Sequence, residues 1–188
     1  MKKKCFLISG VSGVGKTSIA YEIVKRDARI EKVITSTTRN IRSNEKDGID
    51  YSFYTKEEFE EMVNRGDFFE HVEVYGNLYG SEKKEVDRIF NSGHIPLFVC
   101  DVQGIINLSK NIENLVKIFI VPDSIDNLRK RIEDRDGYSS DDTEKRLSYV
   151  KEEMKMADIC DYEVVNEQGQ LEKAVNEVLN IINKELTN

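Results

Sequence analysis

Apolar residues gather in five short runs along the chain, and each run has the length and composition of a strand buried on both faces. The runs lie at residues 5–9, 32–36, 95–101, 115–121 and 162–166. Between them, apolar residues recur at spacings of three and four, which predicts helices at residues 17–26, 82–91, 124–135, 143–157 and 171–185. This alternation predicts an α/β fold of three layers, in which a parallel five-stranded core sheet lies between two layers of helices.

One long stretch interrupts the alternation. Between residues 37 and 82, polar turns carry short predicted strands at 51–54, 68–74 and 78–79 and a helix at 56–65, which predicts a small lobe inserted into the core. A second irregular stretch, residues 136–142, is rich in Asp, Ser and Gly and predicts a mobile flap, so that a lid spans about residues 135–145. At 188 residues the chain has the length of one domain, and we expect a single domain with these two appendages.

The first apolar run leads directly into a glycine-rich segment. Residues 9–18 read Ser-Gly-Val-Ser-Gly-Val-Gly-Lys-Thr-Ser, the order of a phosphate-binding loop (P-loop) between a strand and a helix. Such glycines let backbone amides turn toward phosphate oxygens, while the Lys adds positive charge and the Thr hydroxyl can bind Mg²⁺. The alternative, an ordinary glycine-rich turn, does not account for Lys and Thr at this spacing. We therefore predict an ATP site formed by Gly10, Val11, Ser12, Gly13, Val14, Gly15, Lys16, Thr17 and Ser18, with Thr17 as the metal-binding residue.

The net charge and the cysteine content limit the kinds of partner and metal site that we expect for this chain. The chain has 28 Lys and Arg against 35 Asp and Glu, and this net charge of −7 argues against sequence-independent binding to nucleic acid or to an anionic membrane surface. The basic start of the chain precedes an apolar stretch too short for a signal peptide or a membrane span, so a cytoplasmic location is expected. Three separated cysteines and two separated histidines suit reduced thiols and packing or surface histidines better than a disulfide or a metal cluster.

Several short motifs of the predicted lobe stand in a recognisable order. They are Ser36-Thr37-Thr38-Arg39-Asn40-Ile41-Arg42, Glu45, Gly48, Asp50-Tyr51-Ser52-Phe53, Gly66-Asp67-Phe68-Phe69-Glu70 and Gly76-Asn77-Leu78-Tyr79-Gly80-Ser81. This series resembles the nucleoside-monophosphate lobe of guanylate kinases. The resemblance extends over nearly the whole chain, because the family's order also includes the P-loop, Asp101-Val102-Gln103-Gly104, Arg131, Arg135, Arg146-Leu147 and Asn166.

The residue types in the lobe suit a purine monophosphate. Two arginines offer planar forks and two tyrosines offer hydroxyl donors to a phosphate dianion, although surface ion pairs are the alternative for the arginines. The Glu70 carboxylate could accept from N1–H and N2–H₂ of guanine, and an exposed strand carboxylate is the alternative. The Thr35 and Ser81 hydroxyls could reach O6. The predicted GMP-binding residues are Thr35, Arg39, Arg42, Tyr51, Glu70, Tyr79, Ser81 and Asp101.

The resemblance implies an enzyme that transfers the γ-phosphoryl group of ATP to GMP or dGMP, with Mg²⁺, in purine nucleotide metabolism. The catalytic set that it implies consists of Lys16, Arg39, Arg131, Arg135 and Arg146. In the family, arginines at the last three of these positions close on the phosphates of ATP. Val99 stands where the family usually has an acidic residue, so we expect a raised Mg²⁺ requirement.

Two other functions stay open at this level. A guanylate-kinase-like binding module would use the fold to recognise peptides without catalysis, but such modules typically have degraded phosphate loops, and Gly15-Lys16-Thr17 is intact here. A P-loop kinase for another phosphorylated acceptor, such as a sugar phosphate, is disfavoured by Glu70, Ser81 and Asp101, which suit a base. The sequence leaves the oligomeric state open.

Overall fold

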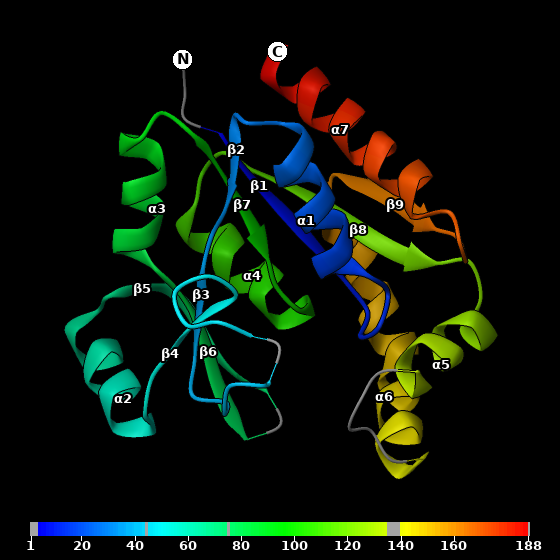
Figure 1. Ribbon diagram of the computed structural model, residues 1–188, viewed down its shortest axis with the longest axis horizontal. Helices are drawn as coiled ribbons and strands as arrows, with labels where there is room; N and C mark the ends of the chain where they lie inside the picture. The colour runs from blue at the N-terminus through cyan, green and yellow to red at the C-terminus, as the bar shows by residue number, and fades with distance from the viewer. Residues whose placement is uncertain (1–3, 44, 75, 135–139, 188) are drawn as a thin grey trace.

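The computed structural model of the chain describes residues 4–43, 45–74, 76–134 and 140–187. Its core is a sheet of five parallel strands in the order β2-β7-β1-β8-β9 (Figure 1). The strands are β1 (Cys5–Gly10), β2 (Ile30–Lys32), β7 (Ile95–Val99), β8 (Leu115–Pro122) and β9 (Tyr162–Asn166). The predicted α/β fold with a parallel five-stranded core sheet is therefore confirmed.

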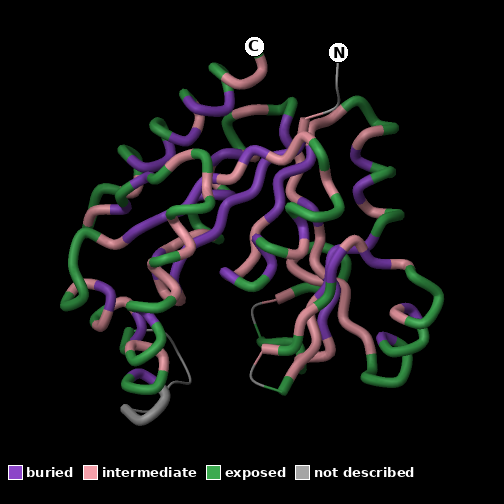
Figure 2. The backbone as a smooth tube through the Cα atoms, turned by 180° about the vertical axis from the view of Figure 1, so that it is seen from behind, coloured by how far each residue is buried: buried purple, intermediate pink, exposed green. Residues whose placement is uncertain are grey.

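Helices cover both faces of this core sheet. From β1 the chain crosses to the β2 edge of the sheet, whereas the later connections move back toward the β9 edge. Because all these crossovers are right-handed, the helix after β1 lies on one face of the sheet and the helices of the later connections lie on the other. Helices α1 (Lys16–Arg26) and α7 (Leu171–Thr187) pack together on one face. The other face carries α3 (Lys83–Asn91), α4 (Val102–Asn111), α5 (Ile125–Glu133) and α6 (Ser140–Met154), the last followed by a 3-10 helix at Lys155–Ile159. The central strands β1, β7 and β8 are buried along most of their length (Figure 2), which explains their continuous apolar runs, whereas the edge strands β2 and β9 are only partly buried.

A second sheet of four strands lies beside the core, in the order β4-β3-β6-β5. Its strands are β3 (Thr35–Thr37), β4 (Tyr51–Phe53), β5 (Phe68–Val74) and β6 (Asn77–Glu82), and helix α2 (Lys56–Arg65) packs on it. We call these five elements the lobe. The lobe has its own small core, in which Phe59 stacks on Phe68 with ring centroids 4.5 Å apart, and Met62 completes the cluster.

The single strand predicted at residues 32–36 is wrong. The chain forms β2 in the core sheet, leaves it after Val33, and forms β3 in the lobe sheet. Val33 N still donates to Leu97 O of β7, whereas Ser36 already pairs with Gly80 of β6. An apolar run shows that a segment is extended and buried, but not which strand it pairs with, and here the partner changes within five residues.

Helix α4 was not predicted, although it carries buried apolar residues at helical spacing in Val102, Ile105 and Leu108. Its start is fixed by Asp101, whose Oδ1 accepts from the backbone N–H groups of Gln103 and Gly104 as an N-cap. The predicted flap at 136–142 lies mostly outside the described residues. Its last residues, 140–142, belong instead to the first turn of α6, which begins three residues before the predicted helix.

Candidate active site

The P-loop runs from the end of β1 to the start of α1, between the lobe and the α5–α6 pair (Figure 1). Two of its glycines are required by their surroundings. Gly10 has φ 144°, and a Cβ there would lie 2.3 Å from the carbonyl oxygen of Ile120. Gly15 has φ 101°, and its Cβ would lie 2.6 Å from Nδ2 of Asn166. The loop can follow this path only with glycine at both positions.

Positive side chains meet at this loop. Lys16 Nζ donates to the carbonyl oxygens of Gly10 at 2.7 Å and Val11 at 3.0 Å. Arg146 of α6 donates to Ser12 Oγ at 2.6 Å. Arg131 of α5 donates to Val14 O at 3.3 Å, and also to Asn166 O and Gln168 Oε1. The predicted Arg135 lies outside the described residues.

The exposed first turn of α1 contains Thr17 and Ser18. Within the described residues no group of three or more His, Cys, Asp and Glu side chains could hold a metal ion. This donor set fits Mg²⁺ that is bound mainly by phosphate oxygens and by the Thr17 hydroxyl, which is the usual way proteins hold Mg²⁺ on a nucleotide. Val99 is partly buried and packs against the hydrophobic core, and the raised Mg²⁺ requirement stays a prediction.

Strand register separates the two faces of the lobe sheet. Thr35 pairs with Tyr51, Thr37 pairs with Tyr79, and Glu70 pairs with Ser81. Because paired residues share a face and alternate residues of one strand do too, five of the predicted GMP-binding residues lie on one face of the lobe sheet. They are Thr35, Tyr51, Tyr79, Ser81 and Glu70.

A β-bulge decides the direction of Glu70. The register shifts between Phe68 and Glu70, so that Phe68 pairs with Glu82 while Glu70 pairs with Ser81. In a regular strand, residues 68 and 70 would share a face. The shift instead sends Phe68 into the lobe core and Glu70 to the opposite face, which is a known use of bulges beside functional sites.

Glu70 is a buried carboxylate with one free acceptor. Its side chain accepts a 2.8 Å hydrogen bond from Ser81 Oγ at Oε1, and the residue is only 7% exposed. Within the described part of the chain, Oε2 is buried and has no hydrogen-bond partner. Burial raises the pKa of Glu70 to about 7, the negative charge of Asp101 acts in the same direction, and the Ser81 hydroxyl opposes both. The lobe carboxylate Glu70 therefore feels the charge of Asp101, the N-cap of α4 in the core.

Arg39 and Arg42 both lie beside the carboxylate of Glu45. Arg39 Nη2 contacts the two Glu45 carboxylate oxygens at 2.8 and 2.9 Å, and its guanidinium stands 5.4 Å from the centroid of the Tyr51 ring. Arg42 Nη1 is 3.9 Å from Glu45 Oε1, and the Arg42 side chain is exposed. The structure thus brings Arg39 to the Tyr51 face of the lobe, where Glu45 holds it in place, and leaves Arg42 exposed beside Glu45.

Two residues at the P-loop were missed as site residues in the sequence. Asn166 Nδ2 donates to Val14 O at 2.8 Å and so ties the end of β9 to the loop. Glu153 of α6 accepts a 3.3 Å hydrogen bond from Ser12 N at Oε2. The only signal for Glu153 is its position two helical turns after Arg146, which puts both side chains on one face of α6.

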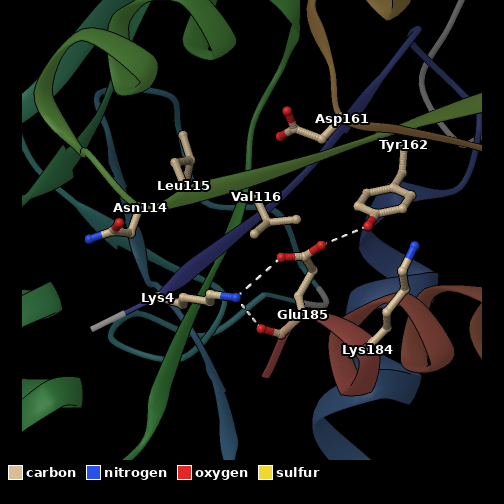
Figure 3. Close-up of a pocket in the computed structure, with 8 residues that line it drawn as sticks. All are labelled: Lys4, Asn114, Leu115, Val116, Asp161, Tyr162, Lys184 and Glu185. Carbon is tan, nitrogen blue, oxygen red and sulfur yellow. Dashed lines mark hydrogen bonds and ion pairs between the residues drawn. The ribbon is translucent and has the colours of Figure 1, made fainter. Parts of the chain in front are cut away.

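A hollow of about 550 Å³ lies at the amino-terminal ends of β8 and β9, opposite the end of β1 that leads into the P-loop (Figure 3). Three of the polar side chains that line it form hydrogen bonds or ion pairs with one another. Lys4 Nζ lies 3.2 Å from Glu185 Oε2, and Tyr162 OH donates to Glu185 Oε1 at 2.7 Å. These contacts attach the end of α7 to β1 and β9, and the hollow is separate from the nucleotide site.

Comparison with known proteins gives a consistent picture. The family model for guanylate kinase matches residues 2–185. The guanylate kinase of Thermotoga maritima is 41% identical over 98% of this chain and 88% of its own, and that of Bdellovibrio bacteriovorus is 33% identical over 95% and 100%. In the described part of the chain, no helix combines the length and apolar character needed to cross a bilayer.

Solved structures agree with these sequence matches. The crystal structure of guanylate kinase from Anaplasma phagocytophilum superposes with a TM-score of 0.79 at 30% identity and covers 97% of this chain and 86% of its own. A sugar kinase from Janibacter superposes with a TM-score of 0.52 at 12% identity, covering 96% and 95%, and so shares the fold alone. By sequence over nearly its full length and by structure, this chain belongs to the guanylate kinase family.

Proposed function

We propose that this chain is an enzyme that transfers the γ-phosphoryl group of ATP to GMP or dGMP, giving ADP and GDP or dGDP. The observation that carries the proposal is the buried Glu70 Oε2, an acceptor without a partner in the described structure, on the site face of the lobe. A buried acceptor without a partner costs free energy, and a ligand that supplies a donor removes that cost. Guanine supplies two adjacent donors, N1–H and N2–H₂.

Base recognition follows from this acceptor. Glu70 would accept from the two guanine donors, and the Thr35 hydroxyl would donate to O6. The Ser81 hydroxyl could donate to O6 only by releasing Glu70 Oε1, which takes its one proton in this structure. Adenine presents an acceptor at N1, so it would leave the carboxylate unpaired and face it with a lone pair. A site built around a buried polar group rejects the base that cannot pair with it.

The two phosphate sites use different elements. On the lobe, Arg39, Arg42, Tyr51 and Tyr79 would hold the GMP phosphate, and Asp101 would border the base. On the core, the P-loop amides and Lys16 would hold ATP, and the α5 and α6 arginines Arg131, Arg135 and Arg146 would close on its phosphates. Catalysis is then positioning plus charge neutralisation, and no covalent enzyme intermediate is needed.

In the transfer itself, an oxygen of the GMP phosphate forms a bond to the γ-phosphorus as the bond from the γ-phosphorus to the bridging oxygen of ADP breaks. The electron pair of the broken bond leaves with ADP. Lys16 must release the Gly10 and Val11 carbonyls to meet the developing charge. Mg²⁺, held by the Thr17 hydroxyl and the phosphates, would neutralise part of that charge.

The same proposal includes the division into a core, a GMP-binding lobe of about residues 37–82 and a lid of about residues 135–145. It also includes ATP and GMP as the partners. The cytoplasmic location and the role in purine nucleotide metabolism are predictions that go with it.

The function is tested by measuring ADP release with ATP and a panel of acceptors, namely GMP, dGMP, AMP, CMP, UMP and a sugar phosphate. We expect GMP or dGMP to be phosphorylated far faster than the others. Lys16→Met should abolish turnover while the chain still folds, because it removes a charge at the transferred phosphate and no core packing. Comparable rates with AMP, or faster turnover of the sugar phosphate, would contradict the proposal.

A further inference from the structure

A carboxylate of α6 accepts a hydrogen bond from a backbone N–H group of the P-loop. Ser12 N donates to Glu153 Oε2 at 3.3 Å, while Arg146, from the same helix, donates to the hydroxyl of Ser12 at 2.6 Å. Backbone amides of a P-loop are anion sites, because the loop and the start of its helix direct N–H dipoles at one place. A carboxylate oxygen at such an amide therefore takes a position suited to a phosphate oxygen.

The charges around Glu153 match this placement. The positive groups that face it are Lys16 of α1 and Arg146 of its own helix, and the negative group that faces it is Asp101 at the start of α4. Burial raises the pKa of Glu153 above its ordinary value, and Asp101 acts in the same direction, while the Ser12 amide and the two cations oppose the rise. Glu153 thus lies in the field of the two cations that a triphosphate would meet at this loop.

We propose that Glu153 is an internal competitor of ATP, which lowers the affinity of the P-loop and couples nucleotide binding to the position of α6. The proposal rests on the proposed function in one respect, that the P-loop binds ATP. When the triphosphate arrives, like charges repel, so Glu153 must either take up a proton or move off the Ser12 amide. Since Arg146 lies on the same helix face, a movement of α6 that withdraws Glu153 also changes where Arg146 meets the phosphates.

The test is Glu153→Gln, which keeps the size and one acceptor oxygen but removes the charge. Glu152→Gln is the matched control, because Glu152 is on the same helix, is 71% exposed at its side chain and pairs with Lys155. ATP affinity is measured by calorimetry at pH 8, with and without Mg²⁺, on the full chain. We expect E153Q to bind ATP about tenfold or more tightly than wild type, the scale of one charge-assisted hydrogen bond, and E152Q to match wild type.

A second readout separates competition from a structural effect. Because burial raises the pKa of Glu153, lowering the pH from 8 to 6 shifts this carboxylate toward its protonated form, and the difference in ATP affinity between wild type and E153Q should shrink. The protonation of ATP itself affects both proteins equally and cancels in the comparison. Melting temperatures without nucleotide check that E153Q and E152Q fold.

Two results would overturn the inference. Unchanged ATP affinity in a folded E153Q would mean that Glu153 does not compete, and weaker affinity would mean that it supports the nucleotide. If wild type phosphorylates GMP in the acceptor panel, either result overturns this inference alone. If neither wild type nor E153Q binds ATP, both this inference and the proposed function fail.

Discussion

At the scale of single residues, Glu70 combines burial, a shifted pKa and an acceptor without a partner in the described structure. Its Oε1 is satisfied by Ser81, and its Oε2 faces away from any donor that the described residues provide. With a pKa of about 7, the side chain is partly protonated near neutral pH. Guanine donors would favour the ionised form and lower that pKa, so GMP binding and the ionisation of Glu70 are coupled.

Glu70→Gln tests this coupling. The amide replaces one acceptor oxygen with a donor group that faces the guanine donors. The value of kcat/KM for GMP should therefore fall roughly ten- to a hundredfold, which corresponds to a loss of about 1.5–3 kcal/mol of transition-state stabilisation. ATP affinity should stay unchanged. In wild type, KM for GMP should fall as the pH rises through about 7, since the carboxylate must be ionised to accept both donors.

The stability of the same variant has a defined sign. Because the pKa of Glu70 is raised from 4.5 to about 7 on folding, the folded chain binds more protons than the unfolded chain between these values, and its stability falls as the pH rises through them. E70Q should therefore gain melting temperature relative to wild type at pH 8 and lose that advantage at pH 4. Glu73→Gln, on an exposed position of the same strand, is the control. A parallel loss of GMP and ATP binding in E70Q would indicate a misfolded lobe instead.

At the scale of elements, Glu82 holds strands of the lobe together at the point where the lobe sheet leads into α3. This residue ends β6, directly before α3, and is 2% exposed. Its Oε1 accepts from Ser36 Oγ of β3 at 2.5 Å and from Tyr54 OH at 3.1 Å. The Lys84 ammonium lies 2.7 Å from Oε2 as an ion pair, although its approach is not that of a hydrogen bond. One buried carboxylate thus joins β3, β6 and the segment after β4.

Glu82→Ala should lower the free energy of unfolding by about 1.5–3 kcal/mol, because it leaves the buried Ser36 hydroxyl and the Tyr54 hydroxyl without their acceptor. Denaturant unfolding measures the change, and hydrogen exchange locates it. Amides of β3 and β6 should lose protection, while those of β1 and β8 keep theirs. Glu60→Ala, on the exposed side of α2, should have little effect. Equal loss of protection in β1 would show that Glu82 acts on the whole chain.

At the scale of the whole molecule, the P-loop lies on the core sheet, whereas the predicted GMP-binding residues other than Asp101 lie in or beside the lobe sheet, and each part has its own hydrophobic cluster. The P-loop belongs to the core, Glu70 and Tyr79 belong to the lobe, and Arg39 lies in the connection between β3 and β4 of the lobe. The contacts between the two parts include α4 against β5, where Asn111 Nδ2 donates to Phe69 O at 2.8 Å. A substitution that disrupts the hydrophobic cluster of the lobe should therefore weaken GMP binding more than nucleotide binding at the P-loop.

Phe59→Ala tests this independence. Phe59 is fully buried in the lobe cluster, so its truncation should destabilise that cluster by about 3–5 kcal/mol. We expect GMP binding to be lost and ADP binding to persist, as measured by calorimetry. Phe119→Ala in β8 provides the comparison, because Phe119 is equally buried in the core sheet and its loss should weaken both ligands. If F59A loses ADP binding as well, the two parts fold as one unit.

The elements that the sequence predicted correctly are those with local causes. Helix α2 was predicted with its observed bounds, and its ends carry local signals: a capping box between Thr55 and Glu58 at the start and a left-handed Gly66 at the end. The P-loop likewise depends on residues within one short segment. The strands β5 and β9 were also found with their observed bounds, from their patterns alone.

The sequence by itself determined the strand, the P-loop and the helix that follow one another from β1 to α1, because the causes of each are local: an apolar run, glycines with positive φ, and 3.6-residue periodicity. Only the tertiary structure decided which sheet receives each half of residues 32–36, which way Glu70 points after the bulge, and that Glu153 reaches Ser12. Each of these depends on a partner far along the chain, because strand register and helix docking are set by contacts that spacing within one segment does not encode.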